Sequence, residues 1–291
     1  MEQDKIYLLI ATFLFAIGFV YGFYTILRGH KYQGLLLFAF IIGGFAFQTL
    51  GLNIRGAKVM SCPLGNLFEI IQFISWSLIM AYIIIRYVLK LQLLELFTTF
   101  IASALSFFSF LYPQWDKPYE NSLFGGNKWI ELHAALAVFS YGIYALMAAV
   151  AVMYLIQHYS LKRKLPSKVY NFLPSISSSL EGSYKLLLTA LLFYSISAIV
   201  GSMYWFQDFE SISKLKFTMT IALWAFSISL VFLRKKDVVF GEVFAWLCLL
   251  LFNFAILTVL PIDNRSSNKT RDTSGIVELH ESSQEAVLNL K

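Results

Sequence analysis

The stretch IYLLIATFLFAIGFVYGFYTIL, residues 6–27, contains 22 consecutive residues without a charge. As a helix that rises about 1.5 Å per residue, it is long enough to cross the roughly 30 Å hydrocarbon core of a bilayer. Residues 1–5 lack the basic region of a signal peptide, and the apolar run is longer than the core of such a signal. We therefore predict that residues 6–27 form a first membrane span that is retained.

The composition of the whole chain extends this prediction. Of the 291 residues, 58% are hydrophobic and only 14% are charged, which is too few to cover the surface of a water-soluble protein. Repeated apolar runs of about 20 residues exclude a soluble enzyme and a nucleic-acid-binding domain. We expect the lipid bilayer to surround most of the chain, and we expect no nucleic acid among its partners.

Hydropathy divides the chain into two parts. Residues 1–260 are predicted to form an all-α integral membrane domain with about eight transmembrane helices. Residues 261–291 lose this hydrophobicity after Pro261, and we expect them to form a polar, disordered tail. The predicted spans are residues 6–27, 34–53, 67–89, 91–112, 129–156, 184–206, 215–233 and 239–260.

The positions of the basic residues predict the orientation of these spans. Apart from the tail, twelve Lys and Arg residues lie in the loops on one face of the membrane and seven lie on the other. Basic residues concentrate in cytoplasmic loops, and an even number of spans places both termini on the same side. We therefore expect a multi-pass protein of the inner (plasma) membrane with both termini extracytoplasmic. The twelve are Arg28, Lys31, Arg86, Lys90, Lys162, Arg163, Lys164, Lys168, Lys185, Arg234, Lys235 and Lys236.

His133 is the first candidate for chemistry. It lies about one turn inside the outer end of the fifth predicted span, and Ser140 and Tyr144 follow it on the same helical face. A neutral imidazole in this position could bind a metal or haem iron. It could also be an interfacial histidine that is hydrogen-bonded to a neighbour, and the residues alone leave both interpretations open.

The segment Ser61–Glu69, at the entry to the third span, is the second candidate. Asn66 is placed to cap the helix that follows, and one face of that helix carries Glu69, Gln72, Phe73 and Trp76. One interpretation is a capped helix whose carboxylate favours the positive helix N-terminus. The other is that this face lines an outer pocket in which Trp76 is a flat apolar wall.

The order and spacing of these residues resemble the cytochrome c assembly protein family, which includes CcsA (ResC) and a HemX-like branch. The resemblance extends over nearly all of residues 1–260. The segments that carry it are Arg55, the run Cys62-Pro-Leu-Gly-Asn-Leu-Phe-Glu69 with Phe73 and Trp76, His133 with Ser140-Tyr-Gly142, Leu180–Tyr184, Gly201–Trp205 and Trp224–Arg234.

The resemblance implies that the chain binds haem or hands it over at the extracytoplasmic face during cytochrome c biogenesis. It implies that His133 is an axial iron ligand and that Trp76 and Trp205 wall the macrocycle. Glu69 and Arg55 would lie near the loop that positions the haem. The implied partners are other cytochrome c maturation membrane proteins and apocytochrome c.

The sequence departs from the synthetase members of this family at their tryptophan-rich loop. The family pattern Trp-Gly-x-x-Trp-x-Trp-Asp is replaced by Trp205-Phe-Gln-Asp208-Phe-Glu, and Phe232 occupies the position expected for an intramembrane histidine. We expect the chain to be at most part of a haem-attachment system and not a complete synthetase alone. The second axial ligand could come from a partner protein or from one of three residues of this chain, namely Cys62, Met60 and Met203.

Two other functions remain open from the sequence. A HemX-like regulatory or scaffold protein of tetrapyrrole and cytochrome maturation would bind no haem itself and would use the loop 161–185, with Lys162–Lys164, as its contact surface. A small-molecule transporter is disfavoured, because the spans lack the buried charges and the broken helices expected at a midplane site.

Overall fold

The computed structural model of the protein describes residues 2–28, 34–89, 91, 93–117, 127–164, 173–205 and 214–259. Within these ranges every regular element is a helix, so the predicted all-α membrane fold is confirmed. The helices are α1 (Gln3–Leu27), α2 (Gly34–Val59), α3 (Leu67–Leu89), α4 (Leu94–Leu111), the 3-10 turn η1 (Pro113–Trp115), α5 (Lys128–Lys162), α6 (Ile176–Trp205), α7 (Lys214–Lys235) and α8 (Gly241–Leu257).

Seven of the described helices, α1 to α7, are long and apolar enough to cross a membrane. The eighth, α8, is apolar but contains only 17 residues. The eight predicted spans therefore correspond in order to the eight α-helices, and the chain is a multi-pass inner-membrane protein. The predicted tail, residues 261–291, lies outside the described residues.

Three helices begin or end well away from the predicted boundaries, and one of them, α5, ends at Lys162, six residues beyond the predicted end at residue 156. α2 continues six residues beyond the predicted end at residue 53, because the charges of Arg55 and Lys58 are paired with carboxylates of other segments. α6 begins at Ile176, before the predicted start at residue 184. Its first turn is capped by Ser175, whose Oγ accepts a hydrogen bond from the backbone N of Ser178 at 3.1 Å.

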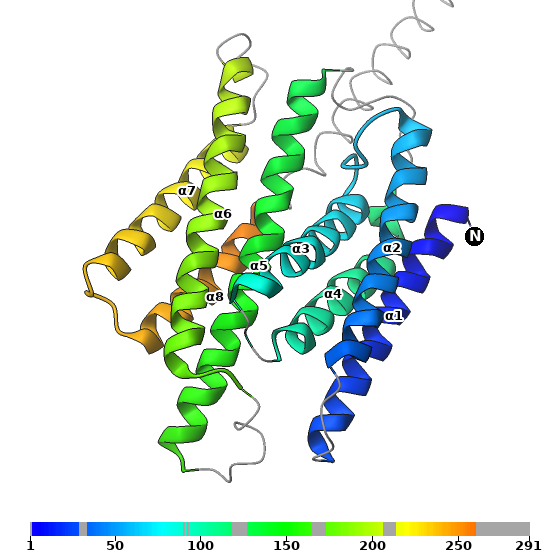
Figure 1. Ribbon diagram of the computed structural model, residues 1–291. Helices are drawn as coiled ribbons and strands as arrows, with labels where there is room; N and C mark the ends of the chain where they lie inside the picture. The colour runs from blue at the N-terminus through cyan, green and yellow to red at the C-terminus, as the bar shows by residue number, and fades with distance from the viewer. Residues whose placement is uncertain are drawn as a thin grey trace, which may run out of the picture.

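The helices form two groups that are joined through α5 (Figure 1). In the N-terminal group, α1 packs against α2 and α4, and α3 packs against α4. In the C-terminal group, α5 packs against α6 and α8, while α7 contacts α6 and α8. α5 also packs against α3, so it is the helix through which the two groups meet, and it is the most buried of the spans.

Gly142 permits the close approach of α5 to α3. A Cβ built on Gly142 would lie 2.5 Å from the Cβ of Ser77 and 2.6 Å from the backbone N of Leu78. Small residues allow helix backbones to come together in this way inside a membrane. The α3-facing side of α5 is therefore identified by the position of Gly142.

The start of α1, the turn between α2 and α3, and the start of α5 lie at the same end of the bundle, which we call the outer end. Asp4 of α1 contacts Arg55 of α2, and Ser61 of the turn donates a hydrogen bond to Glu131 of α5. The assignment of this end to the extracytoplasmic side stays a prediction from the charges.

Candidate functional site

Arg55 is the centre of a buried ion-pair network at the outer end. Its Nε lies 2.6 Å from Oδ2 of Asp4, and its Nη1 lies 3.0 Å from Oε1 of Glu69. Its Nη1 and Nη2 each donate to one carboxylate oxygen of Asp116 at 2.8 Å. The side chain of Arg55 is only 7% exposed. The guanidinium therefore holds together α1, α2, α3 and the segment that follows η1.

Two lysines supply the remaining positive charge of this network. The Nζ of Lys5 lies 2.6 Å from Asp116, and the Nζ of Lys58 lies 2.7 Å from Asp4. Burial by itself raises the pKa of Asp116, but hydrogen bonds from Arg55 and Lys5 more than offset this and hold its pKa below the ordinary value. Asp116 is therefore ionised at neutral pH. The network sets four carboxylates, including the exposed Glu2 at 3.8 Å from Lys58, against three cations.

The turn before α3 is built around Asn66 and Glu69. The Oδ1 of Asn66 accepts a hydrogen bond from the backbone N of Glu69 at 2.9 Å, which confirms the predicted N-cap. The Oε2 of Glu69 accepts a hydrogen bond from the backbone N of Gly65 at 2.8 Å. The first interpretation is thus met for Glu69, because its carboxylate stabilises the helix start; it also pairs with Arg55, and it is not among the residues that line the groove described below.

A second polar cluster lies one to two helical turns deeper between α2, α3 and α4. The Nε2 of Gln48 donates to Oε1 of Gln72 at 3.0 Å and to Oγ of Ser106 at 3.3 Å, and Nε2 of Gln72 donates to Oγ of Ser109 at 2.9 Å. These side chains are fully or almost fully buried. Polar side chains in this position hold neighbouring membrane helices together.

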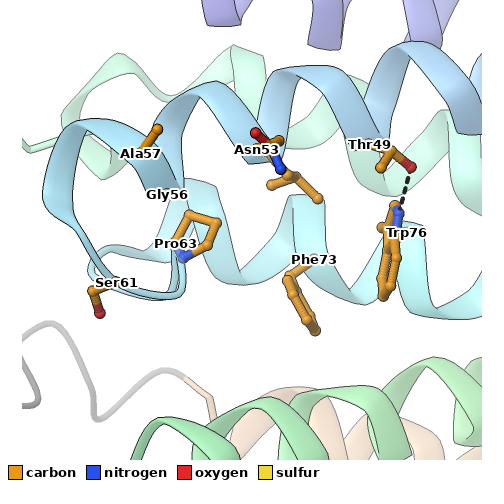
Figure 2. Close-up of a pocket in the computed structure, with 9 residues that line it drawn as sticks. Thr49, Asn53, Gly56, Ala57, Ser61, Pro63, Phe73 and Trp76 are labelled. Atoms are coloured by element: carbon orange, nitrogen blue, oxygen red, sulfur yellow. Dashed lines mark hydrogen bonds between the residues drawn. The ribbon is translucent and has the colours of Figure 1, made fainter. Parts of the chain in front are cut away.

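A groove of about 420 Å³ lies on the α2–α3 hairpin, and its lining residues come from α2, the turn that follows it and α3. The indole Nε1 of Trp76 donates to Oγ1 of Thr49 at 2.8 Å, and the indole ring stacks on Phe45 with centroids 5.6 Å apart. Figure 2 shows Phe73 and Trp76 pointing to the same side of the hairpin. Trp76 therefore walls an outer groove, which agrees with the second interpretation of its helix face. We call this cavity the Trp76 groove.

His133 lies in the second turn of α5 and faces α6. α5 begins at Lys128 because the side chain of Asn127 accepts a hydrogen bond from the backbone N of Trp129 at 3.0 Å. The Nδ1 of His133 lies 2.7 Å from the backbone carbonyl of Ser197, and Oγ of Ser197 donates to the carbonyl of His133 at 2.8 Å. A carbonyl oxygen only accepts, so Nδ1 carries the proton and Nε2 carries the lone pair.

The structure does not bring all the predicted site residues into one site. Glu69 and Arg55 form an ion pair, and Trp76 lies on the neighbouring groove. His133 faces α6, whereas Gly142, nine residues further on and therefore on the opposite face of α5, faces α3. The helix α5 thus separates His133 from Trp76. The backbone of Trp205 ends α6, but its side chain lies outside the described part of the structure.

The three residues considered as a second axial ligand lie in different surroundings. Burial, followed by the charges of Glu131 and Glu69, raises the pKa of the Cys62 thiol to about 12. The thiolate, which is the form that binds metals, is therefore disfavoured there. Met60 is 89% exposed in the α2–α3 turn. Met203 is exposed on α6, the helix that also carries the partner of His133.

Among the residues that the structure describes, His133 is a single potential ligand rather than part of a cluster. Among the described residues, no group of three or more His, Cys, Asp or Glu side chains is arranged to hold a metal ion. A haem iron needs only one or two axial ligands from side chains, so this arrangement fits haem better than a bare metal ion.

These observations define a class of protein, namely a multi-pass helical membrane protein with a charged network and a histidine at the same end. The sequence pattern described as Cytochrome C assembly protein matches residues 64–267. The chain belongs to the cytochrome c assembly protein family, which confirms the resemblance seen in the sequence. Membership gives it a role in cytochrome- and haem-related biogenesis.

Two curated relatives are both described as Protein HemX. The relative from Brevibacillus brevis is 27% identical over 193 residues, which cover 66% of this chain and 70% of the relative. The relative from Bacillus subtilis (strain 168) is 22% identical over 204 residues, which cover 68% and 72%. The family match begins at residue 64, so Arg55 and the whole of α1 and α2 lie outside it.

Several residues of the outer end were not predicted from the sequence. Asp4 and Asp116 are far from Arg55 along the chain, and no local spacing indicates that they meet. Gln48 was also not predicted, although an amide inside an apolar span is costly unless it has partners and therefore indicates a buried polar contact. Ser197, which orients His133, had no such signal, since serine is common in membrane helices.

Proposed function

We propose that the protein binds haem at the outer end of α5, with His133 as an axial ligand, and holds or hands over this haem during cytochrome c maturation. The observation that carries this proposal is the hydrogen bond from Nδ1 of His133 to the backbone carbonyl of Ser197. Metal-binding histidines usually donate their second ring nitrogen to such an acceptor, which fixes the ring and its tautomer. In this tautomer Nε2 carries the electron pair that iron requires.

The surroundings of His133 fit a large, mainly apolar group with acidic substituents. Trp129 and Leu132 at the start of α5 are 57% and 42% exposed, and they provide apolar surface beside the histidine. Lys216 of α7 lies close enough to His133 to interact with it electrostatically. A cation in this position favours the carboxylates that a haem carries. When bound, haem supplies the iron and the vinyl groups that c-type cytochromes hold covalently.

Within this proposal Ser197 and Gly201 orient the ring of His133. Ser197 holds His133 from two directions, since its carbonyl accepts from Nδ1 and its hydroxyl donates to the backbone of His133. Gly201, one turn further along α6, allows the helix to pass directly against the imidazole. The imidazole is therefore held before any ligand arrives, which reduces the entropy lost on binding.

Absorbance titration of the purified protein with haem tests the proposal. We expect a saturable Soret band with wild type and a loss of affinity of at least tenfold with His133→Ala. His158→Ala is the matched control, because His158 lies near the opposite end of the same helix and pairs with Glu242 at 3.2 Å. Equal titrations of wild type and His133→Ala would show that His133 is not the ligand.

A second candidate function is a regulatory or scaffold role without haem binding. It is favoured by the separation of His133 from Trp76, because the aromatic wall implied by the family resemblance is not beside the histidine. In that case the exposed basic residues Lys162, Arg163 and Lys164 at the inner end of α5 would contact a partner. Alanine substitutions there would reduce recovery of cytochrome maturation proteins, while His133→Ala would not.

A further inference from the structure

We infer that the Trp76 groove is a separate binding site for a neutral, flat, conjugated molecule dissolved in the bilayer, of the quinone class. This site is distinct from His133, because α5 lies between the two. It also uses α2, which lies outside the region matched by the family. The inference therefore does not depend on whether His133 binds haem.

One wall of the groove is aromatic. The ring of Trp76 is 5.6 Å from that of Phe45 at an interplanar angle of 19°, and 5.3 Å from that of Phe73. The hydrogen bond from Nε1 of Trp76 to Thr49 fixes the indole in this orientation. Trp76 and Phe73 are only partly buried, so part of each ring faces the groove. Fixed, flat aromatic surface favours a ligand that can stack on it.

The described residues that line the groove carry no charge. Arg55 is adjacent to the lining residue Gly56, but its guanidinium points into the carboxylates of Asp4, Glu69 and Asp116. A ligand with carboxylate or phosphate groups would lose hydration in the groove without meeting a cation. A neutral ligand has no such penalty. This site therefore differs in its ligand preference from the surroundings of His133, where Lys216 favours an acidic ligand.

The opposite wall provides one hydrogen-bonding group for a ligand. The hydroxyl of Thr49 donates to the carbonyl of Phe45, and the hydroxyl of Ser61 donates to Glu131. The side chain of Asn53, one turn from Thr49, has no hydrogen-bond partner among the described residues and lines the groove. An amide N–H in this position can donate to the carbonyl oxygen of a quinone.

The depth of the groove matches a ligand that enters from the lipid. Thr49 and Asn53 precede the end of α2 at Val59 by ten and six residues, which correspond to about 15 Å and 9 Å along the helix. The groove thus extends from the α2–α3 turn, where Ser61 and Pro63 line it, along α2 to Thr49, which lies four residues inside the predicted end of the second span at residue 53. A head group could stack on Trp76 there while its apolar tail stays in the lipid.

Binding of decylubiquinone to the full-length protein in lipid nanodiscs tests this inference, with empty nanodiscs measuring partition into lipid. We expect saturable binding by wild type. Asn53→Leu should weaken binding roughly two- to tenfold, as expected for one lost hydrogen bond, and Trp76→Leu should weaken it about tenfold or more. Asn253→Leu is the matched control, because Asn253 is an exposed asparagine on α8. Asn253→Leu and His133→Ala should leave binding unchanged.

Three results would overturn the inference. One is binding no greater than that of empty nanodiscs. Another is an equal loss in Asn53→Leu and Asn253→Leu. The third is that Trp76→Leu abolishes haem binding while quinone binding is unchanged, which would assign the groove to a tetrapyrrole. Asn53 is exposed, so Asn53→Leu is expected to fold, and its thermal midpoint should match that of wild type.

Discussion

A Cβ built on Gly201 would lie 2.6 Å from Nδ1 of His133. The backbone of α6 therefore passes directly against the imidazole, at the nitrogen that donates to Ser197. Any side chain at position 201 must displace the ring or separate the two helices.

Gly201→Ala should therefore weaken haem binding without removing the ligand. Loss of an outer hydrogen bond to a ligating histidine usually costs about 10- to 100-fold in affinity, and we expect a decrease in that range in a Soret titration. Gly43→Ala is the control, because the nearest side-chain atom to a Cβ there is 3.6 Å away. Identical titrations of Gly201→Ala and wild type would contradict the proposed role of the Ser197 contact.

Arg55→Ala should strongly destabilise the N-terminal group of helices. Removing one partner of a buried ion pair leaves uncompensated charge and costs about 3–5 kcal/mol, and here three carboxylates lose the same partner. Arg55→Lys keeps the charge but loses the paired contact with Asp116, so its effect should be intermediate. Thermal unfolding in nanodiscs measures both. Lys185→Ala, which removes an exposed pair with Glu181, should change the midpoint little.

Cys62 should react slowly with alkylating reagents at neutral pH. Its pKa of about 12, against about 8.5 for an ordinary thiol, lowers the thiolate fraction at pH 8 by roughly a thousandfold. In a Cys248→Ser background, the rate of iodoacetamide labelling should keep rising above pH 9, whereas that of a peptide thiol levels off. Glu131→Gln should increase the rate, because it removes a charge that opposes the thiolate. A plateau near pH 9 would contradict the high pKa.

Most of the fold could be predicted from the sequence, because membrane spans are defined by length and hydropathy. The eight predicted spans correspond to the eight α-helices, and the N-cap at Asn66 was predicted from its position alone. The end of α2 was wrong by six residues. Hydropathy treats Arg55 and Lys58 as the end of a span, whereas their partners in α1 allow the helix to continue.

The candidate site was less predictable, because it depends on which faces of the helices meet. The sequence places Glu69, Trp76 and His133 near the same end of their helices, but it does not show that α5 presents His133 to α6 and Gly142 to α3. Pairing between segments far apart in the chain, such as Arg55 with Asp116, has no local pattern. The helix positions were therefore predictable and the tertiary contacts were not.

The Arg55 network also sets an order of events during synthesis of the protein. Asp4 is made first, Arg55 and Glu69 follow, and Asp116 is added only after α4 is complete. Until then Arg55 lacks the carboxylate that contacts two of its nitrogen atoms. The first four helices can therefore lock together only once all four have left the ribosome and the segment after η1 has crossed to the same side as Asp4. The network can thus form only as one unit, after Asp116 has joined Asp4, Arg55 and Glu69 at the outer end.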